Sequence, residues 1–219
     1  MTSPFESDPL PARLAAGLAK IGLALRNRAW REAGGRGLTP TQGQILALLA
    51  RRAAPLTLGE IARELAVTPA TASDAVEALR AKRLVRKGRS RQDRRTLAVA
   101  LTARGRAEAR RAASWADFLA QAAGELDATE QAVLLRALIK MIRALQERGE
   151  IPVARMCVTC RFFRPHRYPD PLRPHHCDFV NAPFGDRQLR LDCADHVPAP
   201  APDAAFVWQS FIQSEEVRP

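Results

Sequence analysis

The chain has 219 residues, 47% of them hydrophobic and 26% charged, so it is long enough to bury a sizeable core and is neither disordered nor fibrous. It contains no apolar run of about 18 residues and no leader with a basic start and an apolar stretch, so we expect a cytoplasmic protein without a membrane partner. The formal net charge of +11 favours a nucleic-acid partner.

The excess positive charge lies entirely in the first half of the sequence. Residues 1–38 carry a net charge of +3 and residues 39–104 one of +8, whereas residues 105–150 and 151–219 are each neutral. The segment from Arg80 to Arg95 alone has a net charge of +8. Codon bias toward arginine explains part of the total, but it does not explain this local concentration. The distribution therefore predicts that a nucleic-acid-binding surface lies within residues 39–104.

An amphipathic helix is predicted at the N-terminal end of the chain. Apolar residues from Leu14 to Leu25 recur at spacings of three and four, the period of a helix that runs from Pro9 to about Ala33. The glycine-rich stretch that follows ends this helix. We assign residues 1–38 to an N-terminal dimerisation helix.

Residues 39–104 are predicted to form a winged helix-turn-helix domain. Thr39, Thr57 and Thr68 each stand where a helix N-cap is expected, and two of them precede a proline. The helices after Thr57 and Thr68 are short and joined by a tight turn, which is the helix-turn-helix pattern. After Leu84, two strands that enclose a basic turn predict a wing.

Long helices are predicted after the wing, in residues 105–150. One stretch begins at Thr102 and runs to about Ala123, and another begins at Asp127 and ends at Gly149. Their apolar stripes are too large for a small winged domain to cover. We therefore assign this segment to C-terminal dimerisation helices and expect a homodimer, with a monomer whose helices fold back as the alternative.

The basic half resembles the MarR family of winged-helix transcriptional regulators over residues 58–105, with weaker detail from about residue 10 to 149. The matching residues are Leu65-Ala66-Val67-Thr68 in the turn, Ser73, Leu84-Val85-Arg86, Asp93-Arg94-Arg95, Leu101-Thr102 and Gly105. The resemblance implies a homodimer whose two recognition helices enter successive major grooves of a pseudo-palindromic operator. It also implies that Arg95 enters the minor groove and that Asp93 braces it, which agrees with the preference of guanidinium groups for a narrow minor groove.

The DNA-contacting residues are predicted from the recognition helix and the wing. Base contacts are expected from Thr68, Thr71, Ser73 and Asp74, phosphate contacts from Arg63, Arg80, Arg86, Lys87, Arg89 and Arg91, and wing-tip contacts from Asp93, Arg94 and Arg95. Asp74 departs from the family, which often has a basic residue after the serine. Its carboxylate either accepts a hydrogen bond from cytosine N4 or turns inward to Arg80 or Lys82. A solvated charged loop is the alternative interpretation of the basic run.

All four cysteines lie near the C-terminal end, in a segment that we assign to residues 151–197. Two residues separate Cys157 from Cys160, sixteen separate Cys160 from Cys177, and fifteen separate Cys177 from Cys193. Four thiolates suit tetrahedral zinc, and in a cytoplasmic protein this spacing favours a metal over disulfides. His176 and His196 are alternative ligands, because a site of three cysteines and one histidine also binds zinc.

Three interpretations of the cysteine segment remain open. A structural zinc ion would stabilise a short segment that has little core of its own. A [2Fe–2S] or [4Fe–4S] cluster on the same cysteines, shielded by Phe162, Phe163, Phe179 and Phe184, would make the segment a redox sensor. The third interpretation is reduced thiols or a reversible disulfide.

The predicted fold is mainly α with a small β-wing: a winged helix-turn-helix domain, long dimerisation helices and a small irregular cysteine-rich metal module. Residues 198–219 are expected to form a Pro/Ala linker and an apolar tail. The predicted function is a homodimeric, sequence-specific transcriptional regulator, a repressor rather than an enzyme, with a small-molecule effector if the metal is zinc. The alternatives are a metal- or cluster-dependent redox enzyme and a non-specific architectural nucleic-acid-binding protein.

Overall fold

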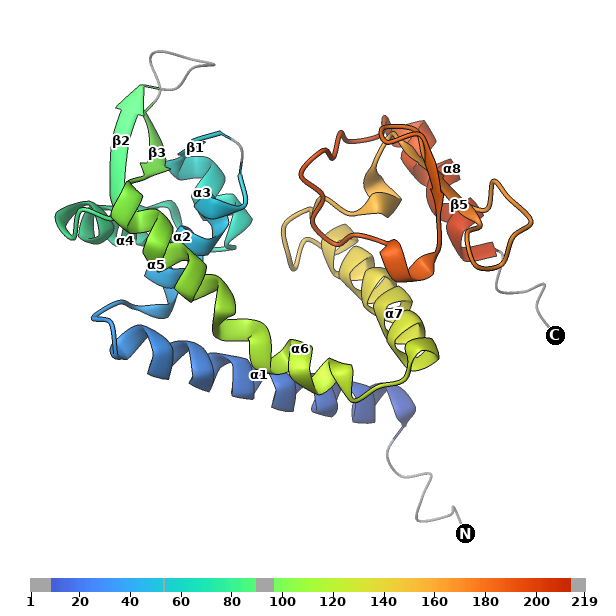
Figure 1. Ribbon diagram of the computed structural model, residues 1–219, viewed down its shortest axis with the longest axis horizontal. Helices are drawn as coiled ribbons and strands as arrows, with labels where there is room; N and C mark the ends of the chain where they lie inside the picture. The colour runs from blue at the N-terminus through green and yellow to red at the C-terminus, as the bar shows by residue number, and fades with distance from the viewer. Residues whose placement is uncertain (1–8, 53, 90–96, 214–219) are drawn as a thin grey trace, which may run out of the picture. The chain divides into compact units, whose positions relative to one another are not determined.

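The computed structural model describes residues 9–52, 54–89 and 97–213, and its chain forms two compact units, Met1–Ala123 and Gly124–Pro219 (Figure 1). Most of the described residues are helical, and each unit adds one small antiparallel sheet. The predicted fold class, mainly α with a β-wing, is confirmed. No helix in the described ranges is both long enough and apolar enough to cross a membrane.

The helices of the first unit begin where the sequence predicts them. The first four are α1 (Leu10–Gly34), α2 (Pro40–Ala50), α3 (Leu58–Glu64) and α4 (Pro69–Ala81). Thr39, Thr57 and Thr68 cap the last three, since each side-chain oxygen accepts a hydrogen bond from a backbone N–H of the first turn, at 3.1–3.2 Å. These caps satisfy backbone donors that the helices themselves leave without partners.

The wing is an antiparallel pair, β2 (Val85–Arg89) and β3 (Leu97–Leu101), in which Val85 lies opposite Leu101. A further strand, β1 (Leu56–Thr57), pairs with the other edge of β3 and gives the order β1-β3-β2. The sequence did not indicate β1, because two residues are too few to show an alternating pattern. The turn between β2 and β3 lies outside the described residues.

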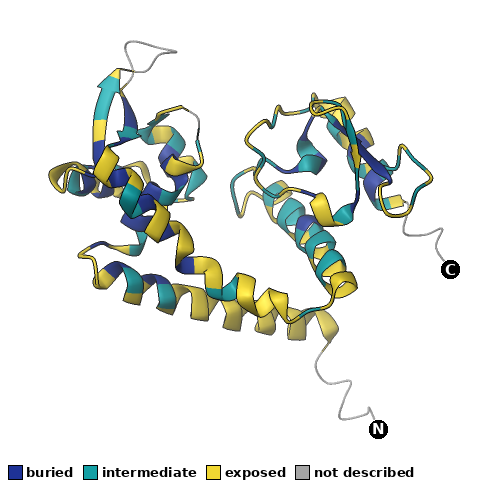
Figure 2. Cartoon of the chain, in the orientation of Figure 1, coloured by how far each residue is buried: buried dark blue, intermediate teal, exposed yellow. Residues whose placement is uncertain are grey.

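The core of the first unit lies between α2, α3, α4, the helix that starts at Ala103 and the wing sheet, and the end of α1 adds Ala29 and Ala33 (Figure 2). Its largest fully buried side chains include Ile45, Leu46, Ile61, Val76 and Leu79, from three of the helices. Burying each such side chain contributes about 1.5–3 kcal/mol to stability. The recognition helix candidate α4 is therefore held by its apolar face, and its polar face is left for another surface.

The helical stretch predicted from Thr102 to about Ala123 is present, but it is not one uniform helix. The stretch is divided into α5 (Ala103–Ala113), a 3-10 turn, η1 (Ser114–Ala116), and α6 (Asp117–Gly124). The turn buries Trp115 against α2, where a Cβ on Gly43 would lie only 2.0 Å from the indole ring. Packing of this large ring, which helical periodicity alone does not reveal, explains the interruption.

The second unit joins α7 (Ala128–Glu147) to the cysteine segment. Its other elements are η2 (Cys157–Thr159), β4 (Phe163–Arg164), β5 (His175–Cys177), β6 (Ala182–Phe184), η3 (Asp186–Gln188) and α8 (Ala201–Gln213). The strands form a sheet of order β4-β5-β6, so the segment that we expected to be irregular has regular structure at its centre. The strands have two or three residues each, too few for sequence periodicity to predict them.

A separate apolar core holds the second unit together. Ile139 of α7, Met156, Val158, Phe163 and Phe211 of α8 are buried in it. The predicted Pro/Ala linker is shorter than expected, because α8 already begins at residue 201. The predicted apolar tail forms most of this helix, which packs on the core of its own unit. The apolar stripe of α7 is covered in part by the cysteine segment, as a folded-back helix would be.

We predict that Gly105→Ala destabilises the first unit by about 1–3 kcal/mol, because an added Cβ would lie 1.8 Å from the Leu84 carbonyl oxygen, a backbone atom that cannot rotate away. Gly59→Ala in α3 is the control, since a Cβ there meets nothing within 4 Å. Alanine should stabilise that helix by up to about 1 kcal/mol. Urea unfolding of both variants measures the difference, and equal stabilities would contradict the prediction.

Candidate nucleic-acid interface and cysteine pocket

Helix α4 presents polar side chains on one face and buries the other. Thr68, Thr71 and Asp74 are exposed and Ser73 is half-buried, whereas the buried residues of the helix are Ala72, Ala75, Val76 and Leu79. The four residues predicted to contact bases therefore surround the accessible start of α4. The N-terminal residues of a recognition helix are those that reach base edges in the major groove.

The hydroxyl groups of Thr68 and Thr71, at the start of α4, are hydrogen-bonded to each other. Thr68 Oγ1 accepts a hydrogen bond from the Thr71 N–H at 3.1 Å, and the two hydroxyl oxygens lie 2.8 Å apart. A cap of this kind holds the first turn rigid, so that the neighbouring side chains are fixed before any ligand arrives. Thr68 is thus both a structural cap and a predicted contact residue.

Glu77 joins α4 to the base of the wing. Its carboxylate accepts a hydrogen bond from Lys87 Nζ of β2 and, through Oε2, one from Arg80 Nε at 2.7 Å. The Lys87 hydrogen bond, followed by that of Arg80, lowers the pKa of the Glu77 carboxyl below its ordinary value. Two predicted phosphate-contacting residues are therefore positioned by one acidic side chain.

The other predicted phosphate-contacting residues in the described part of the chain are exposed. Arg63 lies near the end of α3, and Arg86 and Arg89 lie on β2. Exposed guanidinium groups beside α4 suit contacts with phosphate oxygens. Arg91, Asp93, Arg94 and Arg95 lie outside the described residues, so their predicted roles stay predictions.

The neighbours of Asp74 do not favour the alternative in which its carboxylate turns inward to Arg80 or Lys82. Lys82 Nζ donates to the Gly37 carbonyl at 2.5 Å and to Gln42 Oε1 at 2.8 Å, which ties the end of α4 to α2. Arg80 is bonded to Glu77, and Asp74 itself is exposed. The Asp74 carboxylate is thus accessible to a ligand at the surface.

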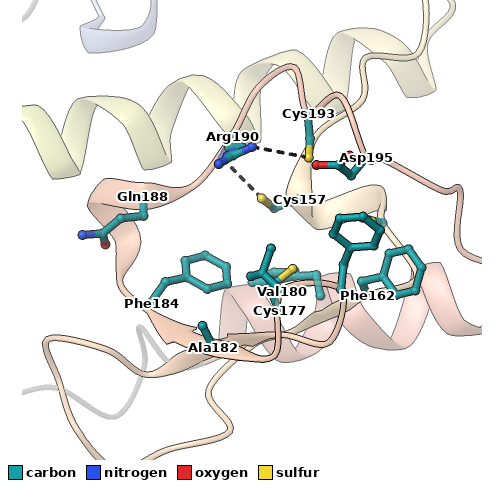
Figure 3. A pocket seen from close by; sticks show the side chains of 13 residues that line it. Cys157, Phe162, Cys177, Val180, Ala182, Phe184, Gln188, Arg190, Cys193 and Asp195 are labelled. Carbon is teal, nitrogen blue, oxygen red and sulfur yellow. Dashed lines mark hydrogen bonds between the residues drawn. The ribbon is translucent and has the colours of Figure 1, made fainter. Parts of the chain in front are cut away.

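The four cysteines, of which consecutive ones are separated by up to sixteen residues in sequence, line one cavity of about 180 Å³ (Figure 3). Cys157 begins η2 and Cys160 directly follows it, Cys177 ends β5, and Cys193 lies in the loop after η3. All four are free thiols. The four cysteines that the spacing groups as one set therefore border the same cavity, and their role as metal ligands stays a prediction.

Aromatic residues form much of the remaining wall. Phe162, Phe163, Phe179 and Phe184, the four predicted to shield a cluster, all line the cavity. Arg190 was not predicted: its backbone N–H donates to Cys157 Sγ at 3.3 Å, and its Nη1 lies 3.9 Å from Cys193 Sγ (Figure 3). Among so many arginines, no sequence signal distinguishes this one.

Burial raises the pKa of the Cys157 thiol to about 11, although the Arg190 N–H opposes the shift. A thiol with such a pKa is protonated at neutral pH and is a poor nucleophile by itself. A bound cation would be needed to hold it as a thiolate. As the side chains stand, no three His, Cys, Asp or Glu residues within the described ranges are close enough together to hold one metal ion.

The alternative histidine ligands lie outside the lining of this cavity. His176 Nδ1 lies 3.0 Å from the Tyr168 hydroxyl, and His196 Nε2 lies 2.9 Å from Thr159 Oγ1. Burial lowers the pKa of His196, which favours its neutral form. Both rings thus have hydrogen-bond partners that explain their positions without a metal.

A buried histidine that the sequence did not single out holds η3 in place. His175 is fully buried, and its Nε2 lies 2.8 Å from Asp186 Oδ1, which also accepts a hydrogen bond from Arg136 of α7 at 3.2 Å. The His175 hydrogen bond is the largest cause of a lowered pKa at Asp186. This network fixes the chain that leads from η3 to Arg190.

Comparison with known proteins finds similarity in the first part of the chain. Residues 36–96 match the model of the MarR family. The Staphylococcus aureus MepR–DNA complex is 25% identical, with a TM-score of 0.53, and the match covers 60% of this chain and 97% of that one. No curated protein matches the chain significantly.

Two further solved structures share the fold. Streptococcus pneumoniae FabT in complex with DNA is 22% identical over 62% of this chain and 96% of its own, with a TM-score of 0.53. The transcriptional regulator PA3341 is 24% identical over 61% of this chain and 98% of its own, with a TM-score of 0.55. The family match ends at residue 96, before the first cysteine, Cys157, so it does not include the cysteine pocket.

We predict that Glu77→Gln lowers the thermal midpoint of the first unit at pH 7. Because the pKa of Glu77 is lowered in the folded state, its pairing stabilises the fold above the ordinary glutamate pKa of about 4.3 and is lost as the pH falls through the lower folded value. The difference between the variant and the parent should therefore vanish in acid. Asp74→Asn removes the same charge from an exposed position of α4 and serves as the control. A difference that stays constant from pH 7 to strong acid would refute this account.

Proposed function

Because residues 36–96 form a MarR-family domain, we propose that the protein is a sequence-specific DNA-binding transcriptional regulator. The observation that carries the proposal is the exposed polar face at the start of α4, beside the basic strand β2. A helix of this kind fits the major groove, and a basic wing beside it neutralises backbone phosphates. The similar MepR and FabT structures, which contain DNA, support the same partner.

We further propose that the protein acts as a homodimer on a pseudo-palindromic operator. Leu14, Leu18, Ile21 and Leu25 form one face of α1, and each is 36–55% exposed. A row of large apolar side chains at helical spacing is costly to leave in water, and a second copy of the same helix is a suitable cover. Two copies would present two α4 helices, one to each half-site.

We propose that the protein represses transcription rather than activating it. A dimer that occupies two successive major grooves hinders polymerase when its operator overlaps a promoter. The four cysteines add a proposed metal site in the second unit, either zinc or an iron–sulfur cluster. If the metal is zinc, we propose that a small-molecule effector, rather than the metal, regulates DNA binding.

An enzyme is the less favoured function. The Cys157 thiol is buried with a raised pKa, which is the reverse of an activated nucleophile, and zinc held by four thiolates has no open position for a substrate. A non-specific architectural protein would use the same basic surface. Selection of binding sites from random duplexes separates the two, since an architectural protein enriches no sequence.

We predict that the full chain binds duplex DNA from upstream of its own coding region in a gel shift, with affinity that falls steeply as salt rises. Arg86→Ala and Arg89→Ala should each weaken binding and reduce the salt slope by about 1, because each removes a predicted phosphate contact. Arg26→Ala removes the same charge from an exposed position of α1 and should leave the slope unchanged. Failure to bind any upstream DNA at low salt would overturn the proposal.

We predict that Ile21→Glu converts the dimer to a monomer, because it places a charge in the exposed apolar row of α1. Sedimentation velocity measures the change, and DNA affinity should fall with it because one half-site contact is lost. Ala16→Glu puts the same side chain at an exposed position on the opposite face of α1 and should leave the dimer intact. A monomeric parent protein at micromolar concentration would contradict the dimer.

A further inference from the structure

The cysteine pocket has room for a ligand of several atoms. Its four cysteines come from three separate parts of the second unit, and they line a cavity of about 180 Å³ (Figure 3). Cavities of about 150 Å³ in protein cores are large enough to bind benzene. The cavity that the four thiols border is therefore larger than a single metal ion requires.

The placement of the thiols differs from that of a closed zinc site. Four sulfur atoms bind zinc at about 2.3 Å from one point, so the side chains close around the ion and leave no space between them. In the described part of the chain, no three potential ligands are gathered closely enough to hold one ion. An iron–sulfur cluster, in contrast, keeps its cysteines apart, because iron and sulfide atoms lie between the thiolates.

Aromatic and aliphatic side chains form much of the pocket wall, alongside the polar residues Gln188, Arg190 and Asp195. Its apolar members are Phe162, Phe163, Phe179, Val180 and Phe184, besides Ala182. An apolar wall limits the access of water to a metal centre, which protects inorganic sulfide from hydrolysis and influences the reduction potential. A structural zinc ion with four thiolate ligands gains little from such a wall.

Arg190 supplies the polar contacts that a cluster uses. Its backbone N–H donates to Cys157 Sγ at 3.3 Å, and its guanidinium Nη1 lies 3.9 Å from Cys193 Sγ. Hydrogen bonds to ligating sulfur stabilise the thiolate form, and the guanidinium charge offsets the net negative charge of four thiolates on a cluster. The His175–Asp186 contact at 2.8 Å fixes the chain just before this residue.

We infer that this pocket binds an iron–sulfur cluster through Cys157, Cys160, Cys177 and Cys193. The inference rests on the metal site of the proposed function and names its occupant. It places the cluster in the second unit, so DNA binding by the first unit is tested separately.

The test is the metal content of the full chain, purified without oxygen and, in a parallel sample, reconstituted with ferrous iron and sulfide. We expect iron and acid-labile sulfide in equal amounts, with broad visible absorption. Two of each per chain indicate [2Fe–2S], and four of each indicate [4Fe–4S]. One zinc per chain without sulfide overturns the inference but keeps the metal site, and a chain that binds neither metal overturns both.

Matched variants show whether the thiols of this pocket hold the iron. Cys177→Ser and Cys193→Ser should each lose most of the iron and sulfide, whereas Val180→Ala, which alters the same wall without removing a ligand, should keep both. A gel shift on each variant shows whether the DNA-binding unit is folded. Serine variants that retain the full iron and sulfide content would overturn the inference. Failure of the parent to bind DNA, with its iron and sulfide present, would overturn only the proposed regulator.

Discussion

The carbonyl group of Leu84 is the point on which the DNA-binding surface depends. It accepts hydrogen bonds from the Thr102 N–H at 3.0 Å and the Thr102 hydroxyl at 3.1 Å, and Gly105 lies against it without a side chain. Leu84 follows the end of α4 and precedes β2, while Thr102 follows β3 and caps α5. One peptide group thus fixes the recognition helix, both strands of the wing and the next helix relative to one another.

The turn before Leu84 makes this junction possible. Arg83 has a φ of 57°, in the left-handed region, and the Leu84 N–H donates to the Leu79 carbonyl at 2.9 Å. This is a helix C-terminal motif in which glycine is the usual residue, so arginine is held there by the contacts around it. Together with the Glu77–Lys87 pair, it sets the direction in which the wing leaves α4.

In the second unit an apolar core, rather than the four cysteines, organises the chain. Phe163 lies between β5 and α8, with its ring 5.2 Å from His175 and 6.0 Å from Phe211, centre to centre. Arg136 of α7 donates to the Phe211 carbonyl at 2.6 Å and lies over its ring. These contacts join β4, β5, α7 and α8, and the Cys157 N–H, which donates to the Arg190 carbonyl at 3.0 Å, joins η2 to the loop after η3. The thiols thus face one cavity in a unit that already has a core.

The sequence by itself determined the helix starts, the wing strands, the exposed polar face of α4 and the grouping of the four cysteines. These follow from local signals: N-cap threonines, apolar periodicity, clustered charge and short cysteine spacing. Only the tertiary structure decided the break at Trp115, the short strands, the packing of α7 and α8, and the contacts of Arg190 and His175. Those features depend on burial and hydrogen bonding between residues far apart in the chain, which leave no periodic pattern in the sequence.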